Sequence, residues 1–249
     1  MLLASLSDGV LALTLNRPEK RNALDSVTVD ELTRALEQAE LDSAVRVVAI
    51  RGAGKDFCAG LDLDELLASA DQSPEENEKT AGRLGNVYTT IRRLPKPVVA
   101  IVQGRALAGG CGVATSCDMV LAASSAQFGY PEILRGFVPA MVMTILRRLV
   151  GEKRAFDLVA TGRSVTATEA LELGLISQVL PDAGLETSAQ ALLKQLAGSS
   201  ASALALIKRL FYELDDRSFE EGIALGARVN AMARAHPDFK NALAAFLKR

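Results

Sequence analysis

The sequence predicts an α/β core at residues 1–182, followed by an all-helical region at 183–249. Up to residue 182, short β-prone runs alternate with amphipathic stretches, which is the pattern of strands joined by helices. Beyond that point the strand pattern stops and one helical segment follows another. The chain of 249 residues is long enough for one core with a helical appendage. We expect the helical domain to dock on its own core or on a neighbouring subunit.

The elements follow in order along the chain. The first predicted strand, 10–15, stops at Asn16-Arg17-Pro18, because proline fixes its own φ and disfavours helix in the preceding residue. Asp25 or Ser26 is the expected N-cap of an amphipathic helix that ends near Glu40. The other expected core elements are strands at 45–50, 98–102, 119–121 and 176–180, and helices at 75–93, at 140–149 and after the capping-box sequence Thr166-Ala167-Thr168-Glu169.

Composition argues against several classes of function. The formal charge of −2, the 4% aromatic content and the absence of Trp argue against nucleic acid, which needs clustered basic residues or stacking platforms. No signal peptide and no membrane span are visible, so we expect a cytoplasmic protein. The three cysteines form no CxxC pair and His236 is the only histidine. We therefore expect no metal site and no histidine-activated nucleophile, and we interpret His236 as a surface loop residue.

Two small-residue turns are candidates for anion binding. The first is the turn at 57–64, which a buried strand feeds and a helix follows; the second is the glycine-rich segment at 104–112, which opens a short helix. Such turns can leave backbone N–H groups exposed, and two of them together could form an oxyanion hole. The alternative for the second segment is tight packing of a helix on the sheet. The spacing fits neither a dinucleotide motif nor a P-loop.

Glu132 is the candidate proton-transfer group. It follows Pro131 and stands between apolar stretches, so partial desolvation would raise the pKa of its carboxyl and suit it to acid/base work. The alternative is a glutamate at a helix start that faces water.

These segments, in this order, resemble the crotonase superfamily of enoyl-CoA hydratases and isomerases. The resemblance extends to Asn16-Arg17-Pro18, Asn22-Ala23-Leu24, Cys117-Asp118 and the stretch 161–176, and it covers essentially the whole chain. It implies a spiral core of strand-strand-helix turns with a C-terminal helical oligomerisation domain. It also implies an acyl-CoA substrate, no separate cofactor, and a homotrimer or a hexamer formed as a dimer of trimers.

The resemblance also implies roles for individual residues. The oxyanion-hole amides are those of Leu61 and Gly109. The backbone around five residues holds coenzyme A, and two C-terminal residues reach the coenzyme A of a neighbouring subunit. The five are Lys20, Arg21, Ala23, Ala59 and Leu61, and the two are Phe246 and Arg249.

One departure from the family pattern bears on the reaction. Hydratases of the family usually carry two glutamates; Glu132 matches the second, but Gly112 stands at the first. A single glutamate is the pattern of the Δ3,Δ2-enoyl-CoA isomerases. On this resemblance Gly112 leaves room for a differently held water or a bulkier acyl group. Tyr130 and Asp62 are candidates for holding water, with a packed phenol and a helix cap as the alternatives, while the apolar stretch 138–143 favours a dry pocket.

Four functions stay open from the sequence. The first is an enoyl-CoA enzyme with Glu132 as its only acid/base, which isomerises or hydrates in an atypical way. The second is a full hydratase with a substitute for the missing glutamate. The third is another superfamily reaction, such as thioester hydrolysis or decarboxylation. The fourth is a catalytically silent acyl-CoA-binding subunit or an RNA-binding member; the charge balance argues against RNA, and the presence of Glu132 with both oxyanion turns argues against a silent subunit.

Overall fold

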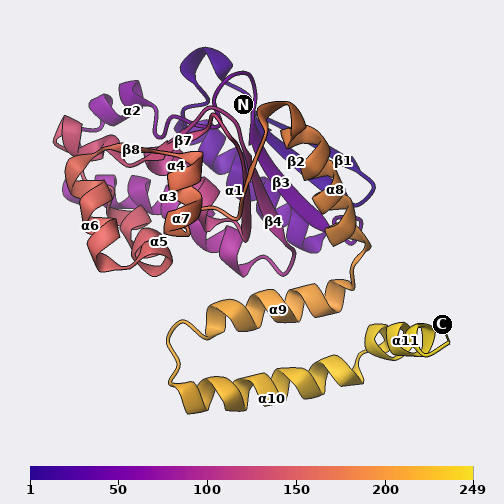
Figure 1. Ribbon diagram of the computed structural model, residues 1–249. Coiled ribbons are helices and arrows are strands. Elements are labelled where there is room, and N and C mark those ends of the chain that lie inside the picture. The colour runs from indigo at the N-terminus through magenta and orange to yellow at the C-terminus, as the bar shows by residue number, and fades with distance from the viewer. Residues whose placement is uncertain (249) are drawn as a thin grey trace.

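The computed structural model describes residues 1–248, and its core is a six-stranded sheet with helices packed around it (Figure 1). The strand order is β1-β2-β3-β4-β6-β9; β1 is antiparallel to β2 and the other neighbours are parallel. Parallel strands need crossover helices, which is the predicted alternation. The strands are β1 (Leu2–Ser7), β2 (Val10–Leu15), β3 (Val47–Gly52), β4 (Val98–Val102), β6 (Met119–Ala123) and β9 (Gln178–Leu180).

The edge strand β1 was not predicted. It forms a hairpin with β2 through Asp8 and Gly9, which both have positive φ. Asp-Gly between two β-prone runs is a strong hairpin signal, so this strand could have been found. The predicted strand at 45–50 was also placed two residues too early, since β3 begins at Val47.

A second, three-stranded sheet was also missed. It consists of β5 (Arg105–Leu107), β7 (Gln127–Gly129) and β8 (Ser164–Thr166). Gly104 carries the chain from β4 to β5 with φ +57°, and a Cβ there would lie 2.0 Å from the Lys55 carbonyl oxygen. Only glycine therefore fits the turn that leads from one sheet to the other.

Helix caps explain where several helices begin. Asp25 accepts a hydrogen bond from the Thr28 N–H (2.8 Å) and opens α1 (Ser26–Leu41), while a capping box at Ser73 opens α3 (Pro74–Arg93). Thr166 opens α7 (Ala167–Leu173) as predicted, because its side chain accepts from the Glu169 N–H. The capping box is incomplete, since the Glu169 carboxylate pairs with Arg163 instead of returning to Thr166. The remaining core helices are α2 (Leu63–Ala68), α4 (Ala108–Ser116), α5 (Ala140–Val150) and α6 (Glu152–Thr161), with 3₁₀ turns at Pro18–Lys20, Pro131–Arg135 and Asp182–Gly184.

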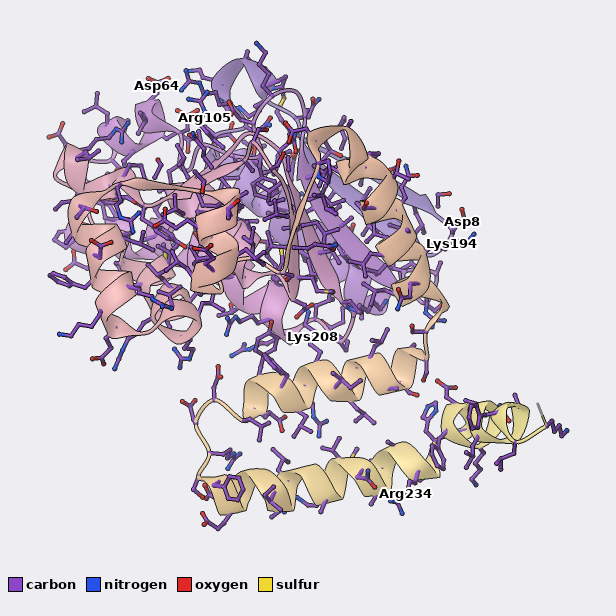
Figure 2. The ribbon with its side chains drawn as sticks, in the orientation of Figure 1. Asp8, Asp64, Arg105, Lys194, Lys208 and Arg234 are labelled. Atoms are coloured by element: carbon purple, nitrogen blue, oxygen red, sulfur yellow. The ribbon has the colours of Figure 1, made fainter. Side chains whose placement is uncertain are left out.

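The C-terminal region is helical, as predicted. Of its helices, α8 (Leu185–Gly198) packs on the six-stranded sheet, whereas α9 (Ala201–Glu213), α10 (Phe219–Ala235) and α11 (Pro237–Phe246) extend away from it (Figure 1). Lys208 of α9 points back to the core, where it donates to the Ile91 carbonyl (2.7 Å) and pairs with Asp118 (2.7 Å; Figure 2). Within residues 1–248, no helix combines the length and apolar character that a membrane crossing requires.

Candidate active site

The two small-residue turns predicted from the sequence lie side by side. The Cys58 N–H donates to the Arg105 carbonyl (3.0 Å), and the Leu107 N–H donates to the Cys58 carbonyl (2.9 Å). A Cβ on Gly60 would lie 2.7 Å from the Ala108 Cβ, so glycine is required for this close approach. The structure thus brings Leu61 and Gly109 together from segments almost fifty residues apart.

The local backbone leaves both candidate amides without ordinary partners. Gly109 is the second residue of α4, and the first N–H groups of a helix have no partner within it. The Gly60 carbonyl and the Asp62 N–H both bond to Leu24. Leu61, which lies between them, makes no hydrogen bond to Leu24, and its N–H has no backbone acceptor among residues 1–248. Two N–H groups available in this way can stabilise a developing negative charge on one oxygen atom.

Sequence reasoning missed the strained residue Ala108. Its φ is +52°, a conformation that costs a residue with a side chain about 1–3 kcal/mol and that clusters at functional sites. It lies directly before Gly109 and against Gly60. The surrounding contacts must hold this turn in place.

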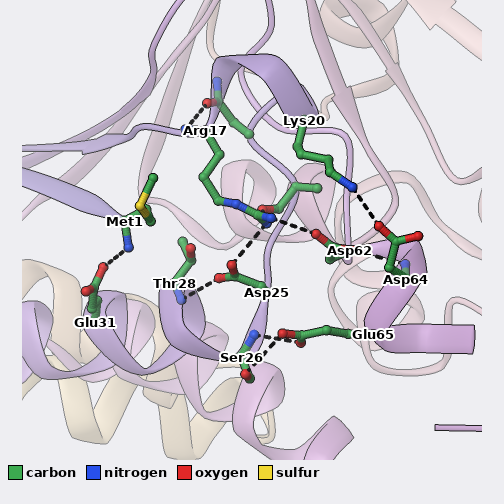
Figure 3. Close-up of polar contacts among 12 residues, drawn as sticks. Met1, Arg17, Lys20, Asp25, Ser26, Thr28, Glu31, Asp62, Asp64 and Glu65 are labelled. Carbon is green, nitrogen blue, oxygen red and sulfur yellow. Dashed lines mark hydrogen bonds and ion pairs between the residues drawn. The ribbon is translucent and has the colours of Figure 1, made fainter. Parts of the chain in front are cut away.

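The N-terminal loop between β2 and α1, residues 16–25, runs along the small-residue turn at 57–64 (Figure 3). Buried Asn22 accepts from the Arg17 N–H (2.9 Å) and donates to the carbonyls of Ala53 (2.8 Å) and Asp56 (2.7 Å). The Ala59 N–H donates to the Arg21 carbonyl (3.0 Å). Four of the residues proposed to hold coenzyme A, namely Arg21, Ala23, Ala59 and Leu61, therefore lie along paired stretches of backbone.

Charged side chains fix the same loop. Arg17 pairs with Asp62 (2.8 Å) and Asp25 (3.2 Å), and half-exposed Lys20 pairs with Asp64 (2.6 Å; Figure 3). Asp62 is also the N-cap of α2, and the hydrogen bond from Arg17 lowers the pKa of its carboxyl. Of the two alternatives for Asp62, a residue that holds water or a helix cap, the structure shows the helix cap. The role of Arg17 was not recognised in the sequence.

Glu132 is buried and carries a free carboxylate oxygen. It projects from the 3₁₀ turn Pro131–Arg135 and is 8% exposed. Its buried Oε2 has no hydrogen-bond partner among the described residues. Burial raises the pKa of its carboxyl above the ordinary 4.5, because desolvation disfavours the charged form. The alternative of a glutamate facing water is excluded.

Other side chains fill the space beside Gly112, the position at which the resemblance places the first glutamate of a hydratase. A Cβ on Gly112 would lie 2.4 Å from Val142 Cγ1, 2.5 Å from Tyr88 Oη and 2.7 Å from Tyr88 Cζ. The expectation that Gly112 leaves room for water or a larger acyl group was therefore wrong. Glycine is required here because Tyr88 of α3 and Val142 of α5 occupy the space.

Tyr88 also borders a cavity of about 460 Å³. The cavity lies between α3 and α5 and reaches Tyr212 and Asp215, and its lining includes Met141 and Ile145. Tyr88 therefore both occupies the space beside Gly112 and lines this cavity.

The other reactive side chains are buried or act as helix caps. Tyr130 is packed in the core, 1% exposed, and its buried hydroxyl has no hydrogen-bond partner among the described residues. His236 caps α11 by accepting from the Asp238 N–H (3.2 Å). Burial raises the pKa of Cys58 and Cys111 to about 12, so neither thiol is a nucleophile near neutral pH. In the described part of the chain, no three His, Cys, Asp or Glu side chains gather as a metal site would require.

Of the two C-terminal residues expected to reach the coenzyme A of a neighbouring subunit, only Phe246 is described, and its contact with that subunit stays a prediction. Phe246 ends α11, is 70% exposed, and belongs to a helix that lies apart from the core (Figure 1). Arg249 lies outside the described residues.

Comparisons with known proteins agree with the fold and the motifs. The profile of the family described as "Enoyl-CoA hydratase/isomerase" matches residues 5–249. The 2,3-dehydroadipyl-CoA hydratase of Escherichia coli K12 is 35% identical over 250 residues, which cover 100% of this chain and 96% of the relative. The 1,2-epoxyphenylacetyl-CoA isomerase of the same organism is 32% identical over 250 residues, covering 100% and 95%.

A solved structure is equally similar. The crystal structure of the enoyl-CoA hydratase of Mycobacterium smegmatis superposes with a TM-score of 0.95 at 35% identity, covering 99% of this chain and 96% of that one. The agreement spans the core and the C-terminal helices. The chain is therefore an enzyme of the enoyl-CoA hydratase/isomerase family, within the crotonase superfamily.

Proposed function

We propose that the protein isomerises Δ3-enoyl-CoA thioesters to Δ2-enoyl-CoA thioesters, with Glu132 as the only acid/base. Two observations support this proposal: the space beside Gly112 is filled by other side chains, and the buried carboxylate of Glu132 has an oxygen without a partner among the described residues. A site with one carboxylate can move a proton between two carbon atoms. Hydration of the usual kind needs a second group to hold and activate water.

In this mechanism Glu132 removes a proton from C2 of the 3-enoyl thioester. The electron pair of the broken C–H bond delocalises through the double bond and into the thioester carbonyl, which becomes the oxyanion of a dienolate. The N–H groups of Leu61 and Gly109 donate to this oxygen. Glu132 then returns the proton to C4 and the double bond reforms between C2 and C3. The raised pKa of the Glu132 carboxyl lies closer to the pKa of the carbon acid and makes the carboxylate a stronger base for the first transfer.

The acyl-CoA would lie between the N-terminal loop and the two turns. The backbone of Arg21, Ala23, Ala59 and Leu61 would hold coenzyme A, with Lys20 nearby, and the thioester would reach the paired amides. Coenzyme A is part of the substrate, and the reaction as drawn uses no separate cofactor.

Atypical hydration is the second candidate. It is favoured by the 35% identity to the 2,3-dehydroadipyl-CoA hydratase. In this reaction Glu132 alone would have to activate water, without help from residue 112.

The two candidates give different products. Purified protein is incubated separately with trans-3-hexenoyl-CoA and crotonyl-CoA, and the products are separated by chromatography and weighed. Isomerisation predicts 2-hexenoyl-CoA of unchanged mass and no product from crotonyl-CoA. A gain of one water on crotonyl-CoA without isomerisation would overturn the proposal in favour of hydration. Loss of the acyl group or of carbon dioxide would indicate another reaction of the superfamily.

A further inference from the structure

Tyr88 connects α3 to the first turn of α4. It is 4% exposed, and its hydroxyl donates to the Gly109 carbonyl at 3.0 Å. Tyr88 thus contacts the residue whose N–H is the proposed oxyanion donor, and its ring occupies the space beside Gly112.

The first turn of α4 needs such an anchor. It contains Gly109 and Gly110, and Gly112 follows directly; glycines leave a backbone unusually free to change φ and ψ. It also begins at strained Ala108, with φ +52°, which relaxes unless neighbouring contacts hold it. The Tyr88 hydroxyl fixes the carbonyl side of Gly109 and thereby limits the rotations that would turn its N–H away from the site.

Tyr88 acts here as a hydrogen-bond donor and not as a base. Burial, followed by the nearby groups Cys58, Cys111 and Glu132, raises the pKa of its phenol well above 10. The phenol therefore stays neutral at physiological pH.

We propose that Tyr88 is a positioning residue of the oxyanion site, which orients the Gly109 N–H through a hydrogen bond to the carbonyl of the same residue. This inference rests on the proposed function, because it assumes that Gly109 stabilises an enolate oxygen. Tyr88 acts through Gly109, so its loss affects the charged intermediate more than the ground state.

The test is the Tyr88→Phe variant, which keeps the ring beside Gly112 and removes only the hydroxyl. Two probes separate the ground state from the intermediate. Butyryl-CoA is saturated and neutral at the thioester, whereas acetoacetyl-CoA enolises readily and can bind as an enolate with its own near-ultraviolet band.

Removing an oxyanion-hole donor costs about 10²–10³ in rate, and a misaligned donor should cost less. For Tyr88→Phe we expect about a tenfold loss of kcat for isomerisation and about a tenfold loss of affinity for acetoacetyl-CoA. The enolate band should weaken, and the affinity for butyryl-CoA should stay unchanged.

Tyr212→Phe is the matched control, because it removes a hydroxyl that bonds to Asp118 at 2.9 Å, away from Gly109. It should change thermal stability without changing the preference for acetoacetyl-CoA over butyryl-CoA. If Tyr88→Phe kept the wild-type preference for acetoacetyl-CoA over butyryl-CoA, or lost affinity for both equally, the positioning role of Tyr88 would be overturned and the proposed function would stand. Wild-type protein that shows no enolate band and isomerises nothing would overturn the proposed function, and the inference with it.

Discussion

At the scale of single residues, Glu132 illustrates how a useful group can destabilise the fold. Its buried carboxylate oxygen has no partner in the described chain, so the carboxylate loses hydration that no group of residues 1–248 replaces. Its raised pKa means that the folded protein binds this proton more tightly than the unfolded chain does. Glu132 therefore stabilises the fold only while it is protonated, below the ordinary carboxyl pKa, and this contribution disappears as the pH rises through the folded-state pKa.

Replacement of Glu132 by Gln should abolish turnover and stabilise the protein at neutral pH. Glutamine keeps the shape of the side chain but cannot ionise. Thermal unfolding followed from about pH 4 to pH 8 should show nearly equal melting temperatures at the acid end and a growing advantage for Glu132→Gln above it. Glu172→Gln, at an exposed glutamate, is the control. Retained activity, or a variant less stable than wild type at pH 8, would contradict the role given to Glu132.

Even the smallest side chain at position 112 should be destabilising. The Cβ of Gly112→Ala would meet Val142 and Tyr88 at 2.4 and 2.5 Å, and overpacking of this kind costs about 1–3 kcal/mol. Gly82→Ala is the matched control, because it places the same methyl group in open space on α3, where alanine is favoured over glycine by about 1 kcal/mol. Urea unfolding of both variants should give changes of opposite sign. A neutral Gly112→Ala would mean that the space is not filled.

At the scale of elements, α9 is attached to the core by a charged residue. Lys208 is the one residue of α9 that is buried, and it reaches Ile91, Lys96 and Asp118. Asp118 also accepts from the Val98 N–H and the Tyr212 hydroxyl, and Arg92 lies 4.6 Å from the centre of the Tyr212 ring. This polar contact joins α9 to the end of α3 and the start of β4.

Lys208→Met should loosen α9 from the core. Removing one partner of a buried ion pair costs about 3–5 kcal/mol, since Asp118 keeps its charge without the ammonium group. Hydrogen exchange should become faster in α9 and stay unchanged in α4. Exposed Lys194 of α8 (Figure 2) supplies the control Lys194→Met, for which neither helix should change. Unaltered exchange in α9 of Lys208→Met would show that other contacts hold the helix.

At the scale of the whole molecule, the extended C-terminal helices expose much apolar surface. Phe211 of α9 and Phe219 and Ile223 of α10 are 68%, 79% and 62% exposed. Apolar patches on helices that leave the core usually belong to interfaces. We propose that further copies of the same chain cover this surface, in the homotrimer or hexamer that the resemblance predicts.

Charged substitutions on this surface should reduce the size of the assembly. Light scattering of the wild type should give the mass of three or six subunits, and Phe211→Asp combined with Ile223→Asp should shift it towards the monomer. Leu41→Asp, at an 87% exposed residue of α1, should leave the mass unchanged. A monomeric wild type would contradict the proposed oligomer.

The elements governed by local chemistry could be predicted from the sequence. Asp25 and Thr166 mark helix starts through hydrogen bonds to residues three positions away, and Pro18 ends an extended run by its own ring geometry. The hydrophobic runs of the parallel strands, the two glycine turns and Glu132 were found in the same way. The short strands β5, β7 and β8 were missed because three residues carry too little periodicity to recognise.

Local sequence patterns are sufficient to predict the α/β alternation, the helical C-terminal region, and Glu132 together with a glycine in place of a further glutamate at position 112. What surrounds these residues depends on the tertiary structure. It placed Leu61 beside Gly109, joined Arg17 to Asp62, and filled the space at Gly112 with Tyr88 and Val142. These contacts join residues 24 to 48 positions apart. They depend on how whole elements pack, and the local preferences from which sequence patterns arise do not specify such packing.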